Sequence, residues 1–314
     1  MTRRLQVAAV VNPAAGGDEG RVVAALEAVG TADVRSVRTT APGDAADIAY
    51  KLAVDDVPPD LVVGVGGDGT VHEVVTGLYR AAESANAAVP RLLVAPGGTG
   101  NSVYRGLWND EPWETVAGQA LSGAAAARTI DLAKIEQNGH MVVLGSGSGL
   151  FAATLLAARN RPETGRDLLM AAALAAMATH EPYPGRVSVD GKVLHDGGVI
   201  ETIVGGFRHR GGLLNLVPES VLDDGLLDIT VVTSAVDMDV FAWAAVHGNV
   251  YEVPGIVRGR GERITVERVD GKPVLYEHDG EVMPQTTPSY DIHVVPAALT
   301  VLTAADAPAW FREG

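Results

Sequence analysis

The 314-residue chain contains no cysteine, few aromatic residues and only four lysines. Without cysteine it has no disulfide framework, no thiolate nucleophile and no thiolate-bound zinc site. Aromatic residues make up 5% of the chain, so the core must be built mainly from the aliphatic part of a hydrophobic content of 47%. With charged residues at only 20%, this composition is typical of a folded protein and excludes a disordered one.

Positive charge and long apolar runs are scarce as well. Lys and Arg number 24 against 39 Asp and Glu, a formal net charge of −15, which repels phosphate backbones and excludes nucleic acid as a general partner. The longest apolar run, residues 168–178, falls short of the roughly 20 residues that span a bilayer, and residues 5–11 are too short for a secretory h-region. We therefore expect a cytoplasmic protein without a transmembrane segment. Its oligomeric state stays open, with a homodimer as one alternative.

The first hundred residues alternate between strand-like and helix-like patterns. Apolar runs typical of buried parallel strands occupy residues 5–11, 32–37, 61–65 and 91–95, and helical patterns occupy residues 21–29, 44–54 and 70–82. This alternation predicts a mostly parallel sheet with helices on its faces, in a domain of residues 1–127. The C-terminal residues 296–314 are expected to return to this domain.

The pattern changes after about residue 127. Asn-Gly or Asp-Gly pairs, which favour hairpin turns, separate short Val- and Ile-rich runs at residues 138–139, 190–191, 270–271 and 279–280. They predict a mainly antiparallel domain over residues 128–295. Helical stretches are expected within it at residues 149–160, 167–179 and 236–250.

Three glycine-rich segments follow three of the predicted strands, at residues 12–17, 66–73 and 96–101. Turns after parallel strands meet at the carboxyl edge of a sheet, where ligands bind, and glycine lets successive backbone N–H groups approach an anion. A helix beginning near Thr70 would add its N-terminal dipole. Any one segment could be an ordinary turn, but three at one edge favour a nucleotide site. A Walker A motif and a Rossmann fingerprint are both missing, so amides, hydroxyls and arginines would hold the phosphates.

Five segments in order resemble the diacylglycerol kinase catalytic-domain family, which includes soluble bacterial diacylglycerol kinases, sphingosine kinases and ceramide kinases. They are Asn-Pro-x-x-Gly at 12–16, Gly-Gly-Asp-Gly-Thr at 66–70, Gly-Thr-x-Asn at 98–101 followed by Arg105, Val-Pro-x-x-x-Leu-Asp-Asp-Gly-Leu-Leu-Asp at 217–228 and Asp-Gly-Glu at 279–281. The resemblance implies an N-terminal α/β domain with a parallel sheet like that of phosphofructokinases and NAD kinases, helices on both faces, and a mainly antiparallel C-terminal β-sandwich domain that receives the lipid.

The resemblance also implies an activity: transfer of the γ-phosphoryl group of ATP to the hydroxyl of diacylglycerol or a related long-chain lipid alcohol, with Mg²⁺ as the second cofactor. Such a transfer depends mainly on positioning and charge neutralisation. The residues implied for nucleotide binding are Asn12, Pro13, Ala14, Ala15, Gly16, Thr39, Gly66, Gly67, Asp68, Gly69, Thr70, Glu73, Thr99 and Asn101. For Thr39, a helix-capping hydroxyl is an equal alternative.

Carboxylates carry the remaining implied roles. Glu281 would accept the proton of the lipid hydroxyl, and Asp68 would organise metal and phosphate, although the two roles could be exchanged. Asp131 matches a family residue near the metal of ATP. A structural metal ion is implied at the side chain of Asp224 and the carbonyls of Val221 and Leu226, because Mg²⁺ prefers such oxygen ligands. Without the family, these residues would be read as loop, hairpin-tip and turn residues.

Three positions depart from the family pattern. Ser102 stands where Asp is common and removes one carboxylate from the metal network. Gly145 and Arg208 each stand where Asn is common, and Arg208 adds positive charge where a substrate head group could bind. His72 in place of Asn is a mild change, since sphingosine kinases carry His there.

The acceptor side is less defined. Apolar helical stretches near residues 152–158 and 168–177 could line an acyl-chain groove or simply pack in the core. Arginines 159 and 161 could make transient contact with a membrane surface, or lie in a solvated loop. Two other functions stay open: an NAD-kinase-like kinase of a soluble acceptor, and a catalytically silent regulator that binds lipid or nucleotide.

Overall fold

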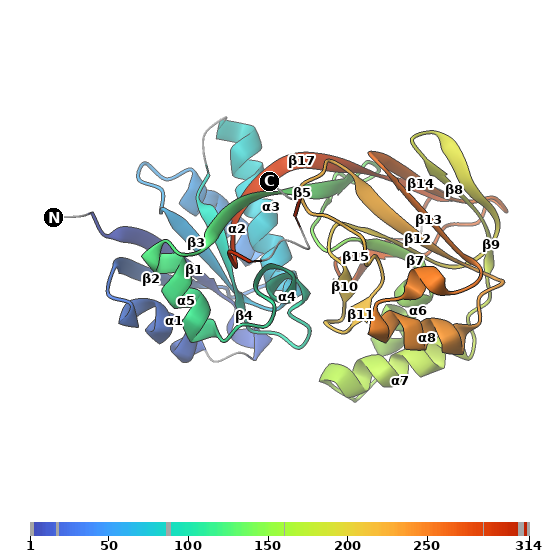
Figure 1. Cartoon of the computed structure of the whole chain (residues 1–314), viewed down its shortest axis with the longest axis horizontal. Coiled ribbons are helices and arrows are strands. Elements are labelled where there is room, and N and C mark those ends of the chain that lie inside the picture. Colours follow the sequence, from blue (N-terminus) through green and yellow to red (C-terminus); the bar gives the residue numbers. More distant parts are fainter. Residues whose placement is uncertain are drawn as a thin grey trace. The chain divides into compact units, whose positions relative to one another are not determined.

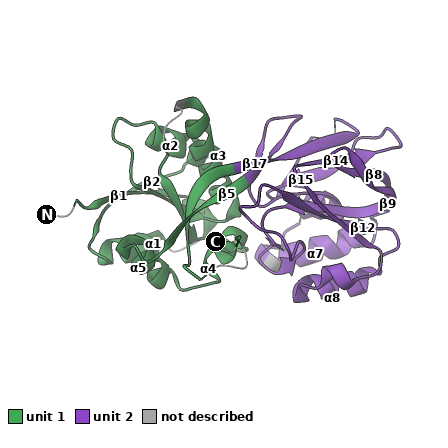
Figure 2. Ribbon diagram, turned by 45° about the horizontal axis from the view of Figure 1, so that its top comes forward, with its two compact units in different colours: residues 1–131, 297–314 green, residues 132–296 purple. Residues whose placement is uncertain are grey.

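A computed structural model describes residues 3–16, 19–85, 89–159, 161–284, 286–306 and 311–312. The chain forms two compact units, residues 1–131 with 297–314 and residues 132–296 (Figure 2). From the sequence we expected these boundaries at residues 127/128 and 295/296. The assignment of nucleotide to one unit and lipid to the other stays a prediction. Gly17 and Asn160, at the ends of two predicted segments, lie outside the described residues.

The first unit is a parallel sheet with helices on both faces. Its elements are β1 (Leu5–Val11), the 3₁₀ helix η1 (Pro13–Ala15), α1 (Glu19–Ala28), β2 (Ala32–Arg38), α2 (Asp44–Ala53), β3 (Leu61–Gly66), α3 (Asp68–Ala85), β4 (Arg91–Pro96), α4 (Ser102–Trp108) and α5 (Trp113–Ser122). The strand order is β2-β1-β3-β4, with every pair parallel. Helices α2 and α3 cover one face and α1 and α5 the other (Figures 1 and 2).

Two further strands contribute residues to both units: β5 (Ala126–Ile135) and β17 (Ser289–Thr303). Within the first unit, β17 pairs in parallel with β4, with Val301 opposite Leu92. This pairing returns the C-terminal part of the chain to the first sheet.

Burial explains why the central strands form. All residues of β3 are buried, and residues 7–11 of β1 are at most 1% exposed, as expected of parallel strands covered on both faces. Helix α2 buries Ala45, Ala49 and Leu52 along one side, with a spacing of three to four residues. The sheet and these apolar helix faces form the core of the first unit.

The second unit is an antiparallel β-sandwich with three helices. Its elements are β6 (Met141–Val142), β7 (Ser146–Gly149), α6 (Leu150–Ala158), α7 (Gly165–Met177), β8 (Tyr183–Val189), β9 (Lys192–Gly205), β10 (His209–Arg210), β11 (Leu214–Asn215), β12 (Leu227–Thr233), α8 (Met238–His247), the 3₁₀ helix η2 (Val250–Glu252), β13 (Ile256–Gly261), β14 (Arg263–Arg268), β15 (Tyr276–His278) and β16 (Glu281–Val282). One strand path is β16-β15-β7-β9-β8-β14-β17, and β12 pairs with β9 and β13. Apolar clusters of buried side chains fill the described part of this unit.

Three of the four Asn-Gly or Asp-Gly pairs lie between paired strands, as predicted, and the hairpin predicted at the fourth was wrong. Asn138-Gly139 lies between β5 and β6, Asp190-Gly191 between β8 and β9, and Asp279-Gly280 between β15 and β16. The last two turns have positive φ at both residues, as a two-residue hairpin requires. Asp270-Gly271 forms no hairpin, because β14 already pairs with β8 and β17 on its two sides.

The helices show further differences from the sequence-based expectation. Helix α3 begins at Asp68, two residues before the expected start, and α4 and α5 were not predicted. Six of the seven residues of α4 are buried, so it has no polar face to mark it as a helix. Within the described ranges, no helix has both the length and the hydropathy that crossing a bilayer requires.

Candidate functional site

The glycine-rich turns after β1 and β3 meet through Asn12. Its side-chain amide donates to the Thr70 hydroxyl at 2.9 Å, and its side-chain oxygen accepts the N–H of Ala14 at 3.0 Å. The backbone N–H of Asn12 donates to the carbonyl of Val65 at 3.0 Å. One asparagine therefore holds η1 against the first turn of α3.

The turns after β3 and β4 touch backbone to backbone. A methyl group built on Gly98 would lie 2.5 Å from the Cα of Gly67, and one built on Gly97 would lie 2.8 Å from the Cα of Gly66. Any side chain at these positions would push the turns apart, so glycine is required on both sides. The backbones of the two turns therefore lie in contact, and glycine backbone of this kind can approach a phosphate closely.

Asp68 and Asn101 hold these two turns closed. The two carboxylate oxygens of Asp68 accept the backbone N–H groups of Ser102 at 3.0 Å and Val103 at 3.1 Å, at the start of α4. Asn101 has a left-handed backbone, with φ of 50°, and its side chain both accepts from and donates to the backbone of Gly98 at 2.8 Å. Asp68 therefore has a positioning task within the loop in addition to any contact with a ligand.

Glu73 and Thr39, two other implied nucleotide ligands, already have partners in the fold. The carboxylate of Glu73 accepts the N–H groups of Gly43 at 3.0 Å and Ala45 at 3.1 Å, which caps the start of α2. Thr39 is buried. The start of α2 is capped by Glu73, and the hydroxyl of the neighbouring Thr40 donates to the Asp44 carboxylate at 2.6 Å. Glu73 thus supports the loop, and nucleotide contact by Thr39 stays a prediction.

Asp131 lies on β5 and accepts the N–H of Ala297 at 2.8 Å. Ala297 has a positive φ of 51°, which is unusual for a residue with a side chain. The bond accounts for one oxygen of Asp131 and fixes the course of β17 at that point. Its implied contact with the metal of ATP stays a prediction.

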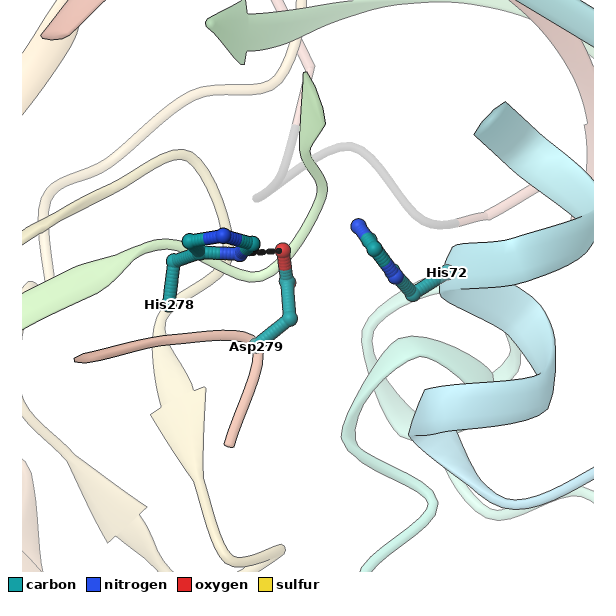
Figure 3. A group of neighbouring side chains, drawn as sticks. All are labelled: His72, His278 and Asp279. Carbon is teal, nitrogen blue, oxygen red and sulfur yellow. Dashed lines mark hydrogen bonds and ion pairs between the residues drawn. The ribbon is translucent and has the colours of Figure 1, made fainter. Parts of the chain in front are cut away.

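In the Asp-Gly-Glu segment of the second unit, the aspartate anchors the turn and the glutamate is exposed. The carboxylate of Asp279 accepts the N–H groups of Val143 at 3.1 Å and Leu144 at 2.6 Å, and its side chain is 2% exposed. A ring nitrogen of His278 lies 3.4 Å from a carboxylate oxygen of Asp279. Figure 3 shows the ring of His278 beside this carboxylate. Glu281 lies at the start of β16 and is exposed. Of the two carboxylates, only Glu281 is free to meet a substrate at the surface.

Two buried carboxyl groups of the second unit were missed by the sequence analysis. Glu201 on β9 and Glu277 on β15 are at most 5% exposed, and both reach over Gly147 of β7, where an added methyl group would lie 2.8 and 3.0 Å from their oxygens. Burial raises the pKa of Glu277 to about 7 and that of Glu201 well above its usual value. The available signal was a glutamate inside a Val- and Ile-rich strand run, at residues 199–204.

The raised pKa of Glu277 predicts a pH-dependent stability. Between pH 4.5 and about 7 the unfolded chain releases this proton while the folded chain keeps it, so the free energy of unfolding should fall as pH rises through this interval. Above it, both states are ionised and the contribution is lost. Urea unfolding at pH 5 and pH 8 measures the difference, which Glu277→Gln should reduce while the exposed Glu262→Gln should not. An equal pH response in all three proteins would contradict the prediction.

Gly145 and Arg208 are two of the positions that depart from the family pattern. Contacts of Arg208 and Arg210 explain how both fit into the fold. Gly145 has φ of 143°, and a methyl group built on it would lie 1.8 Å from the Arg210 guanidinium. That guanidinium donates to the carbonyls of Val204 at 3.1 Å and Phe207 at 3.0 Å. Arg208 donates through Nε to the carbonyl of Ser220 at 2.9 Å. The two arginines therefore make structural contacts in this loop.

The implied structural metal loop has an ion pair that the sequence did not predict. The Asp224 carboxylate accepts the N–H of Leu226 at 3.0 Å and lies 3.0 Å from a guanidinium nitrogen of Arg260. A cationic side chain thus already contacts the proposed side-chain ligand.

Comparison with known proteins agrees with this geometry. Residues 6–135 match the diacylglycerol kinase catalytic domain, and residues 145–303 match the YegS C-terminal NAD kinase beta sandwich-like domain. A probable lipid kinase YegS-like of Xanthomonas oryzae is 31% identical over 302 residues, covering 90% of this chain and 92% of the relative. The probable lipid kinase YegS of Escherichia coli is 26% identical, covering 85% of each chain.

Solved structures show the same fold along almost the whole chain. A Bacillus anthracis structure assigned to the diacylglycerol kinases superimposes with a TM-score of 0.74 at 25% identity, covering 98% of this chain and all of that one. The matched domains occupy both units, and the sequence match to the Xanthomonas relative extends over 90% of the chain. The chain therefore belongs to the diacylglycerol kinase catalytic-domain family of lipid kinases.

Proposed function

We propose that the protein transfers the γ-phosphoryl group of ATP, with Mg²⁺, to the hydroxyl of diacylglycerol or a related long-chain lipid alcohol. The observation that carries the proposal is the convergence of three glycine-rich turns in a chain of this family. Gly66 and Gly67 lie against Gly97 and Gly98, and Asn12 joins the third turn to them. Backbone N–H groups gathered in this way can bind phosphate without a lysine.

The chemistry assigns separate tasks to two carboxylates. Glu281 would accept the proton of the lipid hydroxyl. The hydroxyl oxygen would bond to the γ-phosphorus as the bond from that phosphorus to the β,γ-bridging oxygen breaks and ADP leaves. Asp68 would hold the start of α4 and the turns in register around the phosphates, since both its oxygens accept backbone N–H groups there. When bound, Mg²⁺ would neutralise charge that builds up on the phosphate oxygens. Asp68 and Asp131 are the acidic residues proposed near it.

An assay with γ-labelled ATP and a mixed lipid extract tests the function. The expected product is a labelled lipid phosphate that requires Mg²⁺ and partitions into organic solvent. Label recovered in a water-soluble acceptor would favour the NAD-kinase-like alternative. ATP binding without any labelled product would favour a silent regulator.

Peripheral membrane contact is part of this proposal, and we assign it to one face of the second unit. We define the apolar face as the exposed apolar side chains of α7 and α8, two helices that lie side by side in Figures 1 and 2: Leu169, Met170, Leu174, Met177, Val240, Trp243 and Val246. Met170, Leu174 and Trp243 are 65%, 61% and 58% exposed. The opposite sides of both helices pack into one apolar cluster, through Ala176 and Phe241 among others.

A bilayer surface is the occupant that fits this face. Residues 168–177 of α7 and 240–246 of α8 carry no charged side chain, so the face offers apolar area and an indole that suits the membrane interface. With a net charge of −15, electrostatic attraction to an anionic surface is a weak alternative. Arg161 is also paired with Glu163 at 3.3 Å, which reduces the basic character of the loop between α6 and α7.

Substituting this face should weaken membrane binding. The double variant Leu174→Gln, Trp243→Gln removes two apolar side chains worth about 1.5–3 kcal/mol each when buried, so binding to phosphatidylcholine vesicles should fall by at least roughly 100-fold. Vesicle sedimentation at low and high salt measures it, and the wild type should bind equally at both. Val193→Gln, at a position 60% exposed on β9, is the matched control. Undiminished binding of the double variant, or a loss produced instead by charge reversal at Arg159 and Arg161, would contradict this assignment.

A further inference from the structure

An arginine contacts two nearly buried aspartates where the family resemblance implies a structural metal ion. Arg260 Nη2 lies 3.0 Å from Asp224 Oδ2, its Nε lies 3.2 Å from Asp228 Oδ1, and Nη2 lies 3.3 Å from Asp228 Oδ2. The side chains of Asp224 and Asp228 are 6% and 7% exposed. One guanidinium therefore contacts two carboxylates that water barely reaches.

The strand register keeps Arg260 in this place. Asp228 on β12 and Arg260 on β13 are direct cross-strand partners in an antiparallel pair. Opposite charges at such positions contact each other across the pair. Arg260 Nη2 also donates to the carbonyl of Glu219 at 3.4 Å, so the guanidinium is held from the loop before β12 as well. Reaching Asp224 then requires no displacement of the strand.

The donors around Asp224 leave little room for a metal ion. Its Oδ1 accepts the N–H of Leu226 at 3.0 Å and its Oδ2 faces the guanidinium, so both oxygens already receive donors. Mg²⁺ needs near-octahedral oxygen ligands at about 2.0–2.1 Å. An ion at Asp224 would first have to displace Arg260. Burial raises the pKa of Asp228, and the positive charge of Arg260 opposes that rise.

We propose that the guanidinium of Arg260 takes the place of a divalent cation at the loop of residues 221–226. The loop then folds without metal, and its carboxylates bind a metal ion only when the guanidinium is removed. Arginine suits this task better than lysine, because its planar fork can contact two carboxylates at once, whereas an ammonium is a point charge. The inference concerns the folding of the second unit and does not depend on the reaction proposed above.

Thermal unfolding of the nucleotide-free protein, in EDTA or in millimolar MgCl₂ or CaCl₂, tests the proposal. The wild-type Tm should be the same in all three solutions, and the purified protein should contain less than one tightly bound divalent ion per chain by elemental analysis. Arg260→Gln should lower the Tm by several degrees in EDTA, because two buried carboxylates lose their partner. Divalent cations should restore at least half of that loss.

Three further variants make the result specific. Arg260→Lys keeps the charge, so it should fold even where Arg260→Gln does not, with a smaller Tm loss that divalent cations again reduce. Asp224→Asn combined with Arg260→Gln should abolish the cation response. Arg258→Gln is the matched control and should show no cation response. Arg258 lies on the same strand as Arg260, but it pairs with the exposed Glu219, at 2.7 Å. A wild-type Tm that rises with Mg²⁺, or an Arg260 variant that no cation restores, would overturn the proposal.

Discussion

Glu281→Gln should abolish lipid phosphorylation while leaving the fold and ATP binding intact. A glutamine at this position cannot accept a proton from the lipid hydroxyl, and general bases of this kind contribute roughly 10²–10⁴-fold to the rate. Because Glu281 is exposed at the start of β16, the substitution should change the Tm very little. Turnover of labelled ATP with diacylglycerol, together with ATP binding by calorimetry, measures the two effects separately.

A matched variant separates the role of Glu281 from a general loss of charge. Glu262→Gln removes another exposed carboxylate from the same unit and should keep full activity. If Glu281→Gln retains more than about a tenth of the wild-type kcat, Glu281 is not the base. Asp68 would then be the next candidate for the base, because the family resemblance allows the roles of the two residues to be exchanged.

Asp68→Asn should cost both activity and stability. The amide that replaces one carboxylate oxygen is a donor, so the backbone N–H of either Ser102 or Val103 would face another donor at about the present distance of 3.0–3.1 Å. Leaving such a group without an acceptor costs about 1–3 kcal/mol. The start of α4 should then move away from the glycine turns, and ATP binding and turnover should fall at least tenfold. Chemical unfolding, nucleotide Kd and kcat measure the three effects.

Asp237→Asn provides a control with the same local chemistry. Asp237 accepts the N–H groups of Asp239 at 3.0 Å and Val240 at 3.2 Å at the start of α8, so the substitution weakens an equivalent cap in the other unit. It should reduce stability comparably while leaving the Kd for ATP unchanged. Equal effects of both variants on nucleotide binding would show that Asp68 acts only through overall stability.

The burial of their residues decided which helices and strands could be predicted from the sequence. Strands β1, β3 and β4 were predicted within one residue of their observed ends, because a parallel strand covered on both faces appears as a short apolar run ended by Asn, Gly or Pro. Helix α4 was missed, because its buried residues leave no polar face for periodicity to detect. The Asp270-Gly271 turn had the right residues for a hairpin, but strand pairing made elsewhere decided otherwise.

The candidate site residues likewise divide into those that could be found in the sequence and those that only the structure reveals. The Asp-Gly-Glu segment could be found in the sequence. That Asp279 is anchored by two backbone N–H groups while Glu281 is exposed depends on the hairpin that carries both residues. Glu201 and Glu277 were missed because nothing local shows that two strands place both carboxyl groups over Gly147. Ion pairing of Arg260 with Asp224 was missed for the same reason.

The sequence by itself determined the two-part architecture, the glycine turns at the ends of parallel strands and the family motifs. Each of these depends on neighbouring residues, through hydrophobic periodicity and turn chemistry. Only the tertiary structure decided which carboxylates are anchored by backbone N–H groups, that Glu201 and Glu277 are buried together, and that Arg260 contacts Asp224 and Asp228. Those properties depend on distances between residues far apart in the chain, because burial and charge act through space and not along the sequence.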